Sequence, residues 1–266
     1  MIVFLAYVIV GIFTGILSGL LGLGGGVIIV PALTVLFAWQ EFPSEYIMHL
    51  AIGTSLATMI ITTIMVTWSY HRRSAVQWSL LKFFLPGIVI GSLCGVSIGK
   101  HLSTQDLRYA FALFTIILGV RIIWHANAPH ITKPITVPAP ILFLFALLVG
   151  VLAGILGIGG GIVLIPLFLW LGLSLTHASA TSAACAFSTA FSGALTSILV
   201  GWKASGLPAM TLGFVYWPVA LLLGIASLIG APVGVYLAHR LPVPVIKRIF
   251  GGILLIIAWR MLPLLR

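Results

Sequence analysis

Two stretches of closely similar sequence, one in each half of the chain, decide the fold. Residues 15–31 read GILSGLLGLGGGVIIVP and residues 150–166 read GVLAGILGIGGGIVLIP, so the two align without a gap. In each stretch, three consecutive glycines are followed one helical turn later by a proline. Glycine weakens a helix interior by about 1 kcal/mol relative to alanine, and proline removes a backbone donor. We therefore expect breaks in otherwise helical segments at residues 22–26 and 157–161.

Further matches between the halves occur in the same order along the chain. Gly53-Thr54-Ser55 corresponds to Ala180-Thr181-Ser182. The last set pairs Gly91, Gly95, Leu102, Arg108 and Arg121 with Gly230, Gly234, Leu241, Lys247 and Arg260 in one register. Three matching patches predict a tandem duplication, a plan on which many secondary transporters are built. We expect a first transmembrane repeat at residues 1–125, a linker at 126–138 and a second repeat at 139–266.

The composition places the chain in a membrane. Of 266 residues, 61% are hydrophobic and 6% are charged, and the mean hydropathy is +1.27. Soluble domains carry roughly 25% charged residues, and no soluble core of this length could bury so much apolar surface. One helical crossing needs about 20 apolar residues. The apolar runs predict an all-α integral membrane protein with about eight full spans plus broken or re-entrant glycine-rich helices.

The path of the chain at the glycine breaks decides how the repeats are related. As one helix, residues 2–39 would extend roughly 57 Å, against a bilayer core of about 30 Å. If the chain re-enters at the break, each half crosses an odd number of times and the repeats are inverted; if it only kinks, they are parallel. The positive-inside rule does not discriminate, because either topology groups eight of the thirteen cations on one side. The length of the first run favours inverted repeats.

Charge excludes several classes of function. The formal net charge of +10 is best explained by basic loops on the cytoplasmic side of a bilayer, so we expect no nucleic-acid partner. The only acids, Glu41, Glu45 and Asp106, fall between apolar runs, so the usual intramembrane carboxylate relay is missing. The scattered histidines and two distant cysteines form no pattern of a metal site, a catalytic triad or a carboxylate pair. We therefore expect a protein that is not an enzyme and has no cofactor or metal.

Two kinds of group could contact a substrate. A half-helix that begins after a glycine break points free N–H groups and a positive dipole end inward, which suits an anion. Close helix packing is the alternative explanation for such glycines, and we expect it for Gly15, Gly19, Gly150 and Gly154, which precede the breaks at four-residue spacing. For the breaks themselves, the substrate-binding candidates are Gly24, Gly25, Gly26, Gly159, Gly160 and Gly161.

Hydroxyl-rich segments follow each break. They contain Thr54, Ser55, Thr58, Thr62 and Thr63 in the first half, and Ser179, Thr181, Ser182, Ser188, Thr189 and Ser192 in the second. Hydroxyls donate hydrogen bonds to an anion without trapping it, although they also bond neighbouring helices to one another. The matched pairs Thr54-Ser55 and Thr181-Ser182 are the candidates for substrate contact.

The duplicated glycine block followed by the Thr-Ser helix resembles the TauE/SafE (DUF81) family of sulfite exporters over the whole chain. The resemblance implies an inner-membrane transporter of bacterial type for small sulfur oxyanions or organosulfonates; nothing in composition or spacing indicates sulfur. The leading hypothesis is a secondary transporter that exports a small anion by alternating access between the repeats. A passive anion channel is the alternative. The sequence leaves open the anion, the direction, the coupling ion and the oligomeric state.

Overall fold

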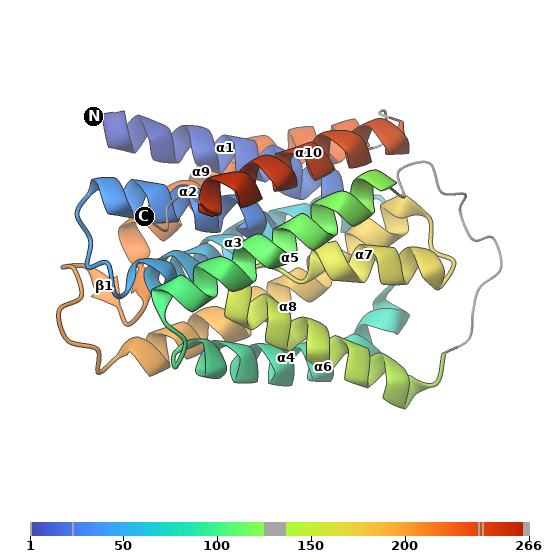
Figure 1. Ribbon diagram of the computed structural model, residues 1–266. Helices are drawn as coiled ribbons and strands as arrows, with labels where there is room; N and C mark the ends of the chain where they lie inside the picture. Colours follow the sequence, from blue (N-terminus) through green and yellow to red (C-terminus); the bar gives the residue numbers. More distant parts are fainter. Residues whose placement is uncertain (1, 23, 125–136, 239, 241, 263–266) are drawn as a thin grey trace.

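The computed structural model describes residues 2–22, 24–124, 137–238, 240 and 242–262, and these are almost entirely helical (Figure 1). The helices are α1 (Ile2–Leu21), α2 (Gly26–Trp39), α3 (Ile47–His71), α4 (Trp78–Gly99), α5 (Thr104–Trp124), α6 (Ala139–Leu156), α7 (Gly161–Trp170), α8 (Leu175–Gly201), α9 (Trp217–Ala238) and α10 (Val243–Met261). A short antiparallel hairpin of β1 (Thr211–Leu212) and β2 (Val215–Tyr216) lies between α8 and α9. Except for residues 137 and 138, the expected linker lies outside the described residues.

Both predicted breaks are present. Helix α1 ends at Leu21 and α2 begins at Gly26, after an N-cap glycine with φ of 86°. Helix α6 ends at Leu156 and α7 begins at Gly161, after an N-cap glycine with φ of 68°. These positive φ angles explain the glycines, because residues with a Cβ seldom adopt them.

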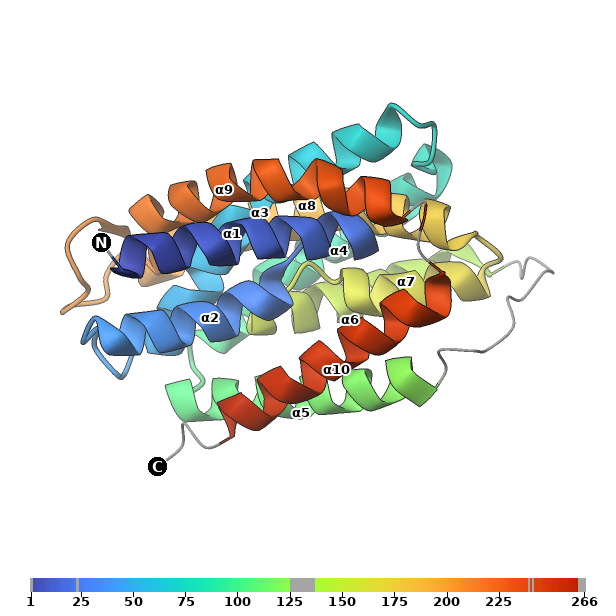
Figure 2. The ribbon, with the colours of Figure 1, turned by 90° about the horizontal axis from the view of Figure 1, so that it is seen from above.

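At the first break the chain turns back. The Gln40 side chain at the end of α2 donates a hydrogen bond to the Tyr7 hydroxyl near the start of α1. Thr14, midway along α1, lies against Gly25. Helices α1 and α2 therefore run antiparallel, as Figure 2 also shows. The segment is re-entrant, which is the alternative that the length of the first apolar run favours.

Seven of the described helices are long and apolar enough to cross a membrane: α1, α3, α4, α5, α6, α8 and α9. Helix α10, with 19 residues, is long enough to be the expected eighth span, but its sequence includes Lys247, Arg248 and Arg260. Helices α2 and α7 are shorter, with 14 and 10 residues. Exposed side chains such as Ile9, Phe191 and Ile225 give the outer surface the apolar character that lipid requires.

The glycines that precede the breaks pack one helix closely against another. A Cβ added at Gly15 would lie 2.9 Å from the Cα of Ser227 in α9, and one added at Gly150 would lie 3.0 Å from the Cα of Gly91 in α4. Gly19 and Gly154 make similarly close contacts one turn further along. The packing role predicted for these four glycines is confirmed. In each case the first helix of one half packs against the fourth helix of the other.

Helices that correspond by sequence lie antiparallel. Gly53 in α3 lies beside Ser197 in α8, whereas Leu56, further along α3, lies beside Gly193, earlier in α8. Helices α5 and α10 cross in the same sense (Figure 2): Gly119 contacts Leu255, and Ile123 contacts Gly251.

The two ends of the bundle differ in charge. One end, at the left of Figure 1, includes the loops at 40–46, 100–103 and 202–210; we call it the acid-bearing face, because Glu41, Glu45 and Asp106 all lie there. Its described cations are Lys100, Arg108, Lys203 and Arg260. The opposite end is the cation-rich face, whose described cations are Arg72, Arg73, Lys82, Arg121, Arg240 and Arg248.

Candidate functional site

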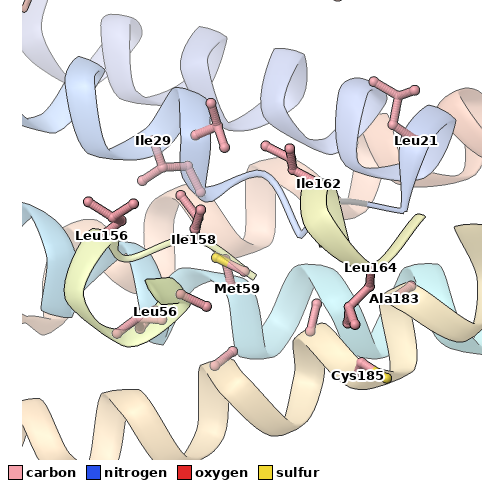
Figure 3. Close-up of a cluster of buried hydrophobic side chains, with 14 of the residues drawn as sticks. Leu21, Ile29, Leu56, Met59, Leu156, Ile158, Ile162, Leu164, Ala183 and Cys185 are labelled. Carbon is pink, nitrogen blue, oxygen red and sulfur yellow. The ribbon is translucent and has the colours of Figure 1, made fainter. Parts of the chain in front are cut away.

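The two glycine breaks meet at the middle of α3. A Cβ added at Gly26 would lie 2.8 Å from the Sδ of Met59 and 2.9 Å from the Cα of Ile158 in the second break. Met59 lies halfway along α3, so the breaks lie far from either end of that helix. Figure 3 shows Met59 and Ile158 side by side at this junction. Segments that are distant in sequence therefore form one central site.

Ser55 and Ser182 hold the breaks in place from opposite halves. The Oγ of Ser55 donates to the carbonyl oxygen of Gly157, and the Oγ of Ser182 donates to that of Gly22, each at 3.0 Å. A broken helix leaves carbonyls without helical partners, and an unpaired buried carbonyl costs about 1–3 kcal/mol. The two serines satisfy these carbonyls reciprocally, and this fixes the helix breaks in position.

Thr54 and Thr181 form a second reciprocal pair. The Thr54 Oγ1 accepts a hydrogen bond from the backbone N–H of Tyr216 at 2.9 Å, just before α9 begins. The Thr181 Oγ1 accepts one from the backbone N–H of Gln77 at 3.1 Å, just before α4 begins. Each threonine thus supports the start of a helix from the other half.

The structure buries all ten predicted substrate-binding residues. It brings Gly26, Ser55 and the second break together, and it places Gly24 between Met59 of α3 and Ala186 of α8. The side chains of Thr54, Ser55, Thr181 and Ser182 are hydrogen-bonded to main-chain groups; the bonds are those given above. Thr54 and Thr181 bond the starts of α9 and α4, while the serines face the breaks directly.

The helices that leave the breaks begin without a side-chain cap. Gly25 and Gly160 are the N-cap residues of α2 and α7, and neither offers a side-chain acceptor for the first turn. The N-terminal N–H groups of a helix and its dipole favour an anion. The geometry therefore supplies hydrogen-bond donors at the centre of the bundle.

The surroundings of the first break include two buried hydroxyls outside the matched Thr-Ser pairs: Ser179, which belongs to the predicted hydroxyl-rich segment, and Ser18, which is not among the residues singled out from the sequence. Ser18 and Ser179 are 0% and 1% exposed, and neither Oγ has a hydrogen-bond partner among the described residues. Ser18 lies one turn beyond Thr14 on the face of α1 that lies against Gly25. A Cβ added at Gly22 would lie 2.9 Å from the Cα of Ser179. Ser18 could have been noticed in the sequence, because it is a point at which the two aligned glycine blocks differ: Ser18 corresponds to Ala153.

Comparison with known proteins places this architecture in a family. The model of the family described as "Sulfite exporter TauE/SafE" matches residues 7–261. A probable membrane transporter protein of Haemophilus influenzae is 29% identical over 95% of this chain and 96% of its own length. The probable membrane transporter protein YunE of Bacillus subtilis is 27% identical, with 97% of both chains covered. A third relative, MJ0441 of Methanocaldococcus jannaschii, bears the same description and is 26% identical over 88% of this chain and 86% of its own length. The chain is a multi-pass membrane transporter, and it belongs to the TauE/SafE sulfite exporter family.

Proposed function

We propose that this transporter exports a small anion, sulfite or a related sulfur oxyanion or organosulfonate, by alternating access. The observation that carries the proposal is that the uncapped start of α2 contacts Gly157 and Ile158 of the second break, after which α7 also begins without a side-chain cap. An anion that sheds its water needs hydrogen-bond donors, and half-helix N-termini with hydroxyls provide them. The family supports sulfite as the first substrate to test.

The first break is the better candidate for direct contact with the anion. Ser18 and Ser179 are the buried hydroxyls beside it without described partners. A buried polar group without a partner costs free energy, and an anion would accept hydrogen bonds from both. In this proposal, Gly24–Gly26 contribute main-chain N–H groups and the second break, with Gly159–Gly161, completes the wall of the site.

We further propose that the halves, residues 1–125 and 139–266, are inverted repeats that rock against one another. The antiparallel pairing of α3 with α8 and of α5 with α10 supports this relation. The positive-inside rule then makes the cation-rich face cytoplasmic, in a cell inner membrane. The junction between the halves is filled by apolar side chains such as Met59 and Ile158 (Figure 3), so passage requires that these residues separate.

Counterflow separates this mechanism from a passive anion channel. Purified protein is reconstituted into liposomes loaded with unlabelled sulfite, and labelled sulfite is supplied outside at low concentration. A carrier accumulates label transiently above its equilibrium level, because inward and outward movements share one alternating site. Immediate equilibration of label together with single-channel currents would instead establish a channel.

The same liposomes identify the substrate. Sulfite, sulfate, thiosulfate, sulfoacetate and taurine compete in turn with labelled sulfite. We expect the sulfur oxyanions to compete. If none of the five anions or zwitterions is transported or competes, the sulfur assignment is wrong, although the family membership stands.

A further inference from the structure

An open cavity of about 830 Å³ lies at the acid-bearing face, outside the central site. Its walls come from the start of α3, the junction of α4 with α5, and the loop that follows α8. Lys100, Arg108 and Lys203 line it from these last two regions, and Glu45 is the acid in its lining. We call this cavity the vestibule.

The positive-inside rule does not explain this cluster of cations. That rule accounts for the cations of the opposite, cation-rich face. Of the four described cations at the acid-bearing face, three line the vestibule and only Arg260 lies elsewhere. Cations drawn from separate segments into one cavity produce a positive potential that concentrates anions there.

The floor of the vestibule holds a polar atom without a described partner. The Nε2 of His49 lies 3.2 Å from the carbonyl oxygen of Gly99, which fixes the ring. Its Nδ1 is buried and has no hydrogen-bond partner among the residues described. Phe214 packs beside the ring, with centroids 5.1 Å apart. The His49 ring is therefore a fixed part of the vestibule floor, and its Nδ1 is enclosed by the protein.

A second, small cavity lies between the vestibule and the second break. It has a volume of about 20 Å³, and its lining shares His49, Lys100 and Phe214 with the vestibule. Its inner lining includes Ile52, whose Cα would lie 2.9 Å from a Cβ added at Gly157 in the second break. A space of this size holds about one water molecule, so an anion could pass here only if the cavity widened.

We propose that the vestibule binds a small oxyanion at the mouth of the transport path, with Lys100, Arg108 and Lys203 supplying the positive charge. The inference rests on the proposed anion transport, since it places this second site on the same route. The occupant is an inorganic or sulfonate oxyanion, recognised by charge and hydrogen-bond acceptors. On the orientation proposed above, the vestibule opens away from the cytoplasm.

The test combines flux and direct binding, with sulfite as the probe in both. Lys203→Gln and Lys100→Gln each remove one positive charge from the vestibule. Arg260→Gln is the matched control, because it removes one charge from the same face outside the cavity. Lys203→Arg keeps the charge at that position, so comparing it with Lys203→Gln separates the effect of charge from the effect of replacing the side chain. Flux is measured in liposomes of defined orientation, and equilibrium binding of labelled sulfite is measured on the solubilised protein.

For either lysine variant, we expect the half-saturating sulfite concentration to rise about threefold to tenfold when sulfite is supplied at the vestibule face. For these variants, the value measured from the cation-rich face should stay unchanged. Arg260→Gln should match the unmodified protein at both faces, and Lys203→Arg should raise the value at the vestibule face less than Lys203→Gln does, because it keeps the charge. Equal values for all variants at both faces would overturn the vestibule site and leave the proposed transport intact. Sulfite binding that the lysine variants weaken, in a protein that transports no anion, would support the site and overturn the proposed function.

Discussion

The two glycine breaks share left-handed glycines at two matched positions, Gly22 with Gly157 and Gly25 with Gly160, and they differ in what surrounds them. Ser55 and Ser182 make the same 3.0 Å bond to the carbonyls of Gly157 and Gly22. Around them, the first break borders Ser179, where the second borders Ile52 at the equivalent place, with the same 2.9 Å spacing. The comparison teaches that the repeated glycines and serines build the break, whereas the residues that differ decide which break is polar.

The same difference extends along the adjoining helices. The Thr14 methyl lies against Gly25 at the first break while its hydroxyl donates to the Val10 carbonyl within α1, and Val149 lies against Gly160 at the second. Ser18 in α1 corresponds to the buried Ala153 in α6. Two serines without described side-chain partners, Ser18 and Ser179, therefore lie at the first break where the second has Ala153 and Ile52. Matched glycines and serines thus surround one break that has these hydroxyls nearby and one that has apolar residues in their place.

The largest effect is expected from filling a break. Gly25→Leu and Gly160→Leu should each abolish sulfite flux while the protein still inserts, because both positions have positive φ and closely packed neighbours. The flanking apolar helices still partition into lipid. Gly252→Leu is the control, since no atom lies within 4 Å of a Cβ added there. Flux in liposomes and the amount of inserted protein are both measured; normal flux from either inserted break variant would leave these glycines a packing role only.

The second-largest effect is expected from removing the hydroxyls that distinguish the first break from the second. Ser18→Ala and Ser179→Ala should each raise the half-saturating sulfite concentration about tenfold, since a hydrogen bond to a charged group contributes about 1.5 kcal/mol or more. Neither should lower thermal stability, because neither hydroxyl has a described partner to lose.

Two controls sharpen that result. Ser97→Ala removes an exposed hydroxyl from α4 and should change neither property. Ala153→Ser, which adds a hydroxyl at the second break, should not rescue Ser18→Ala. Unchanged half-saturation in both Ser18→Ala and Ser179→Ala would remove the functional distinction between the breaks.

A smaller effect, on stability, is expected from removing the serine–carbonyl hydrogen bond that both breaks contain. Ser55→Ala and Ser182→Ala should destabilise the protein equally, by about 1 kcal/mol each, because each leaves a buried glycine carbonyl without its donor. The apparent Tm in detergent measures this, with Ser97→Ala as the reference. Clearly unequal losses would mean that the two bonds are not equivalent.

The sequence predicts the scaffold better than the site. The positive φ at Gly25 and Gly160 follows from local sequence, as does the close packing at Gly15 and Gly150. The roles of the serines do not follow, because Ser182 bonds a carbonyl 160 positions away in the chain. Thr54 and Thr181 are likewise recognisable as a matched pair, but their helix-start partners emerge only when the halves pack together.

The vestibule depends even more on the fold. Lys100 and Lys203 lie in separate loops, and only the tertiary structure brings them to one cavity. The cation count could not distinguish inverted from parallel repeats for a similar reason. It carries no information on which helices run antiparallel, which depends on tertiary packing. The pairing of Gly53 with Ser197, and of Leu56 with Gly193, supplies that information.

The smallest effect concerns the cations in the medium. A carrier for alkali cations needs acceptors at membrane depth, usually carboxylates, because desolvating a cation without them costs several kcal/mol. Glu41, Glu45 and Asp106 all lie at the acid-bearing face, and both breaks present donors instead. Replacing sodium by potassium should therefore change the initial rate of sulfite flux by less than about twofold. Rates in matched sodium and potassium salts, with sulfite omitted in a parallel set, measure this. Robust sodium or potassium flux without any anion would show that the breaks select charge of the opposite sign, through their carbonyls rather than their N–H groups.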